Sequence, residues 1–162
     1  MKFIDTRQDP WRTLGGEDGP MPSPKPAPHQ LLTLEQWHAV REHWPLGLPT
    51  GVKLPNHADV EVLEPDLPRL GLVALEFPKW TDGRAYSQAR LLRARYRFGG
   101  EVRATGEVVV DMLPLLARTG FDAVVMRPGY RQEAADLALR VVPAHYQGDV
   151  SVRQPLFARA AT

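Results

Sequence analysis

The residues best suited to chemistry lie in one short segment, Lys79 to Arg84, which reads Lys-Trp-Thr-Asp-Gly-Arg. It combines two cations, an acid, an indole and a glycine, and it follows an apolar run that predicts a buried strand. In open parallel α/β sheets, ligands bind outside the carboxyl ends of the strands. The segment therefore predicts a site for a small anion, in which Lys79 and Arg84 hold the ligand and Asp82 is a candidate acid–base group.

A second candidate loop begins at Thr105, after another predicted strand. The residues that follow, 107–119, have a helical pattern, and Pro114 within them predicts a kink or a restart of the helix. Free amides and the helix dipole at such a start favour an anion. Thr105 is thus a further candidate ligand and Glu107 a second candidate acid–base group. The same strand-end rule also selects residues 55–57 and 127–130.

Arginine is the dominant cation, with 16 copies against 4 lysines. Residues 1–76 carry a net charge of −4 and residues 77–162 a net +5, which gives the overall +1. Helical spacing places Arg90, Arg93 and Arg97 on one stripe of a predicted helix. Because the planar guanidinium suits bidentate binding of phosphate, sulfate or carboxylate, the stripe indicates an anion or an acidic partner. A solvated helix face is the alternative.

Composition excludes several kinds of chemistry. The near-balanced charge, 20 basic against 19 acidic residues, argues against nucleic acid as a partner. The absence of cysteine excludes disulfides, thiolate nucleophiles and cysteine-ligated zinc or iron–sulfur centres. The 5 histidines do not have the spacing of metal ligands, and the dinucleotide and P-loop fingerprints are missing. We therefore predict no metal and no cofactor, although a bound flavin or NADPH stays open.

The chain is expected to be cytoplasmic. Its first residues lack the apolar core of a secretory signal, and no apolar run approaches the length of a membrane span.

A length of 162 residues with 43% hydrophobic content suits one globular domain. We expect an N-terminal extension over residues 1–30, with a proline-rich linker over 15–28, and a single α/β domain over 31–162. The oligomeric state is not determined by the sequence.

The elements that must position these residues alternate between strand and helix signals. Thr33 and Gln36 have the spacing of a capping box, which predicts the start of a helix. The predicted strands are 51–54, 71–77, 101–104 and 121–126, and the predicted helices are 34–44, 85–97, 107–119 and 132–142. Connectors of about a dozen residues or more between strands require crossovers and hence a parallel sheet. We predict an α/β fold with a small parallel sheet of about four strands built from βα units, either doubly wound or a half-barrel.

Three segments carry a family resemblance. They are residues 77–93, with the pattern Phe-Pro-Lys…Asp-Gly-Arg…Ser…Ala-Arg…Arg, and residues 100–111 and 120–122. Over most of the chain the sequence resembles a bacterial family of unknown function that is encoded beside assimilatory sulfite reductase genes. That family is often labelled an oxidoreductase of sulfite reduction. The resemblance implies a pathway but no established catalytic residue. The positions that match the motif and also lie at predicted strand ends are Lys79, Asp82, Arg84, Ser87, Arg103, Thr105 and Glu107.

The chain departs from the family pattern at four positions. Ala85 and Arg97 replace glycine, Glu107 replaces aspartate and Met112 replaces glutamine. A residue with a side chain cannot adopt a positive φ as cheaply as glycine. If the missing amide of Met112 contacts a ligand in the family, this chain has an altered function.

Two functions from different classes follow as expectations. The first is an accessory protein of assimilatory sulfite reduction that binds a small oxyanion, the sulfite reductase or another sulfur-assimilation protein through the arginine-rich strand-end site. The second is an enzyme that acts on a small anionic substrate, and an oxidoreductase of this kind needs a borrowed redox cofactor. The lack of a visible nucleophile or cofactor motif favours the accessory protein.

Overall fold

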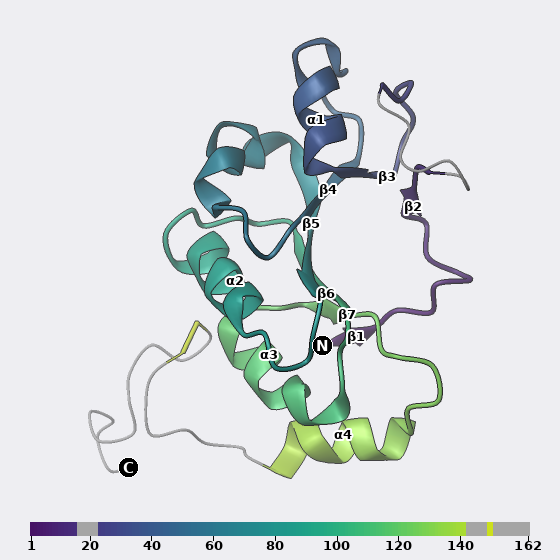
Figure 1. The fold of residues 1–162 in the computed structure, drawn as a ribbon, viewed down its shortest axis with the longest axis vertical. Helices are drawn as coiled ribbons and strands as arrows, with labels where there is room; N and C mark the ends of the chain where they lie inside the picture. The colour runs from purple at the N-terminus through teal and green to yellow at the C-terminus, as the bar shows by residue number, and fades with distance from the viewer. Residues whose placement is uncertain (16–22, 142–148, 151–162) are drawn as a thin grey trace.

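The computed structural model describes residues 1–15, 23–141 and 149–150, and one curled parallel sheet forms its centre (Figure 1). The described part contains 7 strands in the order β1-β7-β6-β5-β4-β3-β2, and all neighbouring strands are parallel. The strands are β1 (Lys2–Phe3), β2 (Arg12–Thr13), β3 (Gln30–Thr33), β4 (Thr50–Leu54), β5 (Leu70–Phe77), β6 (Glu101–Gly106) and β7 (Ala123–Val124). From β3 to β7 each strand lies beside its neighbour in the chain, so every crossover steps in the same direction. The fold is therefore a half-barrel and not a doubly wound sheet.

The connecting helices lie along one face of the sheet (Figure 1). Right-handed crossovers that all step in one direction place their helices on the same face. The α-helices are α1 (Leu34–Val40), α2 (Arg84–Ala94), α3 (Leu113–Thr119) and α4 (Gln132–Val141). The 3₁₀ helices are η1 (Arg41–His43), η2 (Val60–Arg69) and η3 (Val110–Met112).

The sheet has more strands than the predicted four. The prediction of a parallel sheet is confirmed, but the predicted number of about four strands is wrong. The strands that were not predicted are short: β1 and β2 have 2 residues each, and β3 has 4. Such short segments show no hydrophobic period, and they become strands only by pairing with the edges of the sheet. The proline-rich linker predicted over 15–28 falls partly on residues 16–22, which lie outside the described residues.

The helix predicted over 107–119 is divided in the structure. Residues up to Gly106 belong to β6, so Thr105 does not precede a helix start, and that part of the prediction is wrong. The helical part is η3 followed by α3, and Pro114 occupies a first-turn position of α3. The predicted restart at this proline is confirmed, because proline is tolerated where the backbone amide has no partner inside the helix.

Apolar side chains on the helix-covered face form the main core. Val52, Leu54, Leu75 and Phe77 are completely buried there, where α1 packs against β4 and α2 against β5. The capping box predicted at the start of α1 is confirmed. The backbone amide of Gln36 donates to Thr33 Oγ1 at 3.2 Å, and the backbone amide of Thr33 donates to Gln36 Oε1 at 2.9 Å. This cap fixes α1 against the end of β3.

The opposite, inner face is crossed by the N-terminal segment. β1 pairs with β7 at one edge and β2 pairs with β3 at the other, so residues 4–11 span the sheet between them. Trp11 packs against a small apolar cluster of Leu31, Leu72 and Ala74 on this face. The segment therefore covers the inner face near the amino ends of the central strands.

Candidate functional site

The β5–α2 loop holds its shape through the carboxylate of Asp82. Asp82 Oδ2 accepts hydrogen bonds from Arg84 Nη2 at 2.7 Å and from Asn56 Nδ2 at 2.7 Å. Asp82 Oδ1 accepts from Arg84 Nε at 3.0 Å and from the Arg84 amide at 3.3 Å. Asn56 follows β4, so Asp82 links the carboxyl ends of two neighbouring strands to the start of α2.

The electrostatics of this loop argue against acid–base chemistry at Asp82. Hydrogen bonds from the Arg84 guanidinium hold the pKa of the Asp82 carboxyl far below its usual range. The same bonds raise the pKa of the Arg84 guanidinium. A carboxylate with so low a pKa is a weak base at neutral pH. Asp82 also pairs with the Arg84 guanidinium, which was predicted to hold a small anion.

The remaining residues of the loop face solvent. Trp80 is 59% exposed and Lys79 is exposed as well, as is Ser87 on the neighbouring helix α2. Within the part of the chain that the structure describes, the Lys79 and Ser87 side chains have no polar partner. The loop thus presents an indole and a free ammonium group on a frame that Asp82 and Arg84 hold in place.

Glu107 belongs to a neighbouring cleft at the ends of β5, β6 and β7. Its carboxylate pairs with Arg127 at 3.2 Å, a residue of the loop that the strand-end rule selected. The cleft is open, has a volume of about 470 Å³ and is also lined by Glu76, Phe77 and Met126. Gly106 shapes its floor with a φ of +90°, where a Cβ atom would lie 2.4 Å from the Phe77 carbonyl oxygen. Only glycine fits this close approach.

Arg103 and Thr105 lie on β6, the strand next to β5, and not on the loop. The Arg103 side chain is only 3% exposed and pairs with Asp9 of the N-terminal segment and with Glu101. Thr105 Oγ1 donates to the Leu75 carbonyl at 3.2 Å. Both predicted ligands are therefore engaged with the protein itself, and Arg103 is covered.

The three arginines of the predicted stripe do not share one surface. Arg90 is exposed on α2, whereas Arg93 folds inward and donates to the carbonyls of Gly100 at 2.9 Å and Gly120 at 3.0 Å, and to Asp122. Arg97 lies beyond the last residue of α2 with a φ of +52°. The helix is shorter than the predicted 85–97, so the helical spacing does not extend to Arg97.

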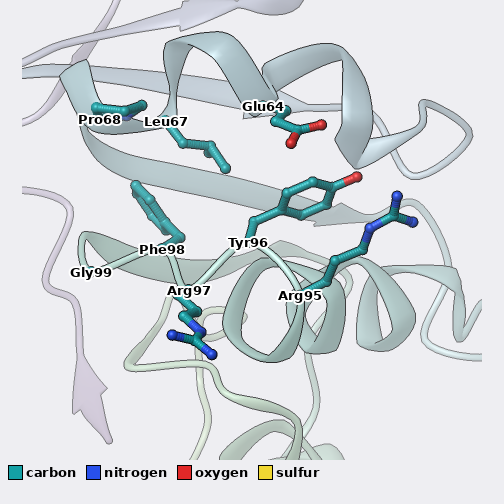
Figure 2. A pocket seen from close by; sticks show the side chains of 8 residues that line it. All are labelled: Glu64, Leu67, Pro68, Arg95, Tyr96, Arg97, Phe98 and Gly99. Carbon is teal, nitrogen blue, oxygen red and sulfur yellow. The ribbon is translucent and has the colours of Figure 1, made fainter.

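Arg97 lies beside a pocket at the opposite end of the sheet, between η2 and the end of α2 (Figure 2). Its volume is about 350 Å³, and the rings of Tyr96 and Phe98 form part of its wall. Figure 2 shows the Tyr96 ring directed toward Glu64 and the Arg97 side chain directed away from them. The chain turns after the end of α2, and this turn places Arg97 beside the pocket and not on the stripe with Arg90 and Arg93.

An ion pair on the inner face was not predicted. Lys53 Nζ lies 2.9 Å from Glu76 Oε1, and both side chains are half-buried. They belong to β4 and β5, where the flanking residues are completely buried. A charged residue at alternate positions of otherwise apolar strands was the sequence signal that could have identified this pair.

Neither a metal centre nor a membrane-spanning helix is found in the described ranges. No group of three or more His, Cys, Asp or Glu side chains is placed to hold a metal ion among residues 1–15, 23–141 and 149–150. Over the same ranges, the helices are too short or too polar to cross a bilayer.

The comparison with known proteins identifies a family. Residues 51–157 match the family described as "Bacterial protein of unknown function (DUF934)". A search of curated proteins finds no significant match. The matched residues include the β5–α2 loop, the cleft at Glu107 and all of α2, and they make up more than half of the chain. The chain therefore belongs to the DUF934 family of bacterial proteins.

Proposed function

We propose that this protein is a non-catalytic accessory protein of assimilatory sulfite reduction that docks onto the sulfite reductase through the β5–α2 loop. The pathway comes from the resemblance carried by residues 77–93, 100–111 and 120–122. The docking surface rests on one observation, the 59% exposed Trp80 beside Lys79, whose ammonium group has no partner among the described residues.

An exposed indole on a fixed loop is suited to binding another protein. Tryptophan and arginine are enriched among the residues that dominate binding energy at protein interfaces, and tryptophan provides a large rigid contact area. The hydrogen bonds of Asp82 with Arg84 and Asn56 hold the loop before a partner arrives. Less ordering entropy is then lost on binding. The net charge of +5 on residues 77–162 favours an acidic partner surface.

Two contacts favour docking over capture of a small oxyanion. The start of α2 is occupied by the Asp82 carboxylate, and Arg84 is already paired with it. Arg103 is covered and paired with Asp9. Lys79 is the one member of the predicted ligand set with a charged group that has no partner among the described residues.

The second candidate function is an enzyme that acts on a small anionic substrate in the cleft at Glu107. The observation in its favour is the 470 Å³ cleft, which holds an exposed carboxylate and an exposed guanidinium. An oxidoreductase at this site would need a flavin or NADPH. A rise in melting temperature with either compound supports the enzyme, and no shift supports the docking protein.

Growth of a deletion strain tests the proposed function. A strain without the gene should grow on sulfide but fail on sulfate and sulfite, because the missing step is sulfite reduction. The wild-type gene and a Leu46→Ala variant, which removes an 82% exposed side chain elsewhere, should restore growth. Trp80→Ala should not restore it. Normal growth of the deletion strain on sulfate would refute the pathway, and rescue by Trp80→Ala would refute the docking loop.

A further inference from the structure

Helix α4 carries an apolar stripe that the core does not cover. Ala135 is the buried residue of this helix, whereas Leu137 is 57% exposed and Val141 is 64% exposed. Ala134, Leu137, Ala138 and Val141 follow the spacing i, i+3, i+4, i+7, which puts them on one side of a helix. The stripe borders an open groove of about 380 Å³ whose other wall is formed by Val110, Asp111 and Pro114.

The charges beside this stripe are arranged to match a second, antiparallel copy. Glu133 lies in the first turn of α4 and Arg140 in the last turn. They are seven residues apart, close to two helical turns, so both lie on the same flank of the stripe. A twofold axis across the middle of the stripe reverses the direction of the second helix. Glu133 then faces Arg140 of the other copy, and Arg140 faces its Glu133.

We propose that the α4 face binds a second copy of this chain, with the two α4 helices antiparallel across a twofold axis. A twofold interface uses the same patch on both copies, and this patch is complementary to itself in both charge and apolar pattern. The Leu137 side chain of each copy enters the groove of the other, which removes its exposed apolar surface from water. The helix is about 15 Å long, so the contact is smaller than a standard interface and the dimer is concentration-dependent.

Sedimentation velocity of the full chain over a wide concentration range tests the dimer. The wild type should change from monomer to dimer as its concentration rises. Leu137→Asp should remain a monomer throughout, because it would bury two carboxylates at the contact. Leu46→Asp is the matched control, since Leu46 is 82% exposed outside α4, and it should dimerise as the wild type does. A wild type that stays monomeric at all concentrations overturns the proposal.

Exchanging the charges at positions 133 and 140 distinguishes a contact between two copies from a role of α4 in the stability of one copy. Glu133→Arg and Arg140→Glu should each weaken self-association about tenfold, because each reversal creates two like-charge pairs in a twofold dimer. An equimolar mixture of the two variants should associate again, because every facing pair is then opposite in charge. A mixture that associates no better than either variant alone overturns the antiparallel arrangement. Unchanged circular dichroism and melting temperature of both variants show that α4 is still folded.

Discussion

Two arginines of α2 each pair with an aspartate, at opposite ends of the sheet, and the two pairs have different roles. Arg93 is 18% exposed and joins Asp122 and the carbonyls of Gly100 and Gly120 at the amino ends of β6 and β7. Arg84 is 59% exposed and binds Asp82 at the carboxyl end of β5. A largely buried guanidinium with several acceptors contributes much more to stability than an exposed pair does. We conclude that the amino end holds the fold together, whereas the carboxyl end shapes the loop that we propose for docking. Complete β/α barrels divide stability and function between their two ends in the same way.

Replacing Arg93 should produce the largest effect on stability. Arg93→Ala removes the charged partner of Asp122 and takes the same donor from three carbonyl oxygens, those of Phe98, Gly100 and Gly120. It should lower the free energy of unfolding by about 3 kcal/mol. Urea denaturation measures the change. Arg90→Ala is the control on the same helix, and because Arg90 is exposed it should shift stability by less than about 0.5 kcal/mol. Equal effects of the two variants would contradict the claim that the contacts of Arg93 stabilise the fold.

Replacing Arg97 should raise stability at the same end of the sheet. Arg97 has a φ of +52°, a conformation in which a side chain is unfavourable and glycine is not. Arg97→Gly should therefore stabilise the protein by about 1 kcal/mol, measured as an increase in the urea midpoint. Arg95→Gly, two residues earlier with a negative φ of −89°, should destabilise it instead. Loss of stability in Arg97→Gly would show that the Arg97 side chain makes a stabilising contact.

Changing Asp82 should affect binding more than stability. Asp82→Asn keeps the shape of the side chain but removes the charge that Arg84 and Asn56 recognise. The loop then loses part of its fixed shape, and affinity for the partner should fall several-fold. Stability should change much less than in Arg93→Ala. Isothermal titration and urea denaturation of the same sample give both values, and a stability loss equal to that of Arg93→Ala would contradict the division of roles.

The contribution of Asp82 to stability should change with pH only in the acidic range. The pKa of Asp82 is lower in the folded protein than in the unfolded chain, because Arg84 donates to its charged form. Its contribution to stability is therefore complete above the ordinary carboxyl pKa and is lost as the pH falls through the lower folded value. Between pH 6 and pH 8, about two units or more above the ordinary Asp pKa, Asp82→Asn and wild type should show a constant difference in melting temperature. A difference that changes within this interval would show that another group titrates with Asp82.

The sequence predicted the local features well and the distant contacts poorly. The capping box at Thr33, the restart at Pro114 and the parallel sheet depend on neighbouring residues or on connector length, and all three are confirmed. One of the two partners of Arg103 is Asp9, 94 residues away, and no spacing rule reveals such a pair. For the same reason, the inward direction of Arg93 could not be distinguished from an exposed stripe.

The candidate site was predicted in part. Lys79, Asp82 and Arg84 do lie on one loop at a strand end, because a strand followed directly by a helix leaves no other place for them. Their mutual pairing was not predicted, although it decides which charges are available. Lys53 and Glu76 were overlooked because each was assigned to a strand, and their meeting depends on the register of β4 and β5.

The affinity of the purified protein for the sulfite reductase, with and without the Trp80 side chain, tests the docking loop most directly. Isothermal titration should show binding by the wild type and by Leu46→Ala. Trp80→Ala should weaken binding at least about 30-fold, as expected when a tryptophan at the centre of an interface is removed. Arg93→Lys, if folded, should bind as the wild type does. Equal affinity of wild type and Trp80→Ala, or no binding by the wild type, would contradict the proposed role of the β5–α2 loop.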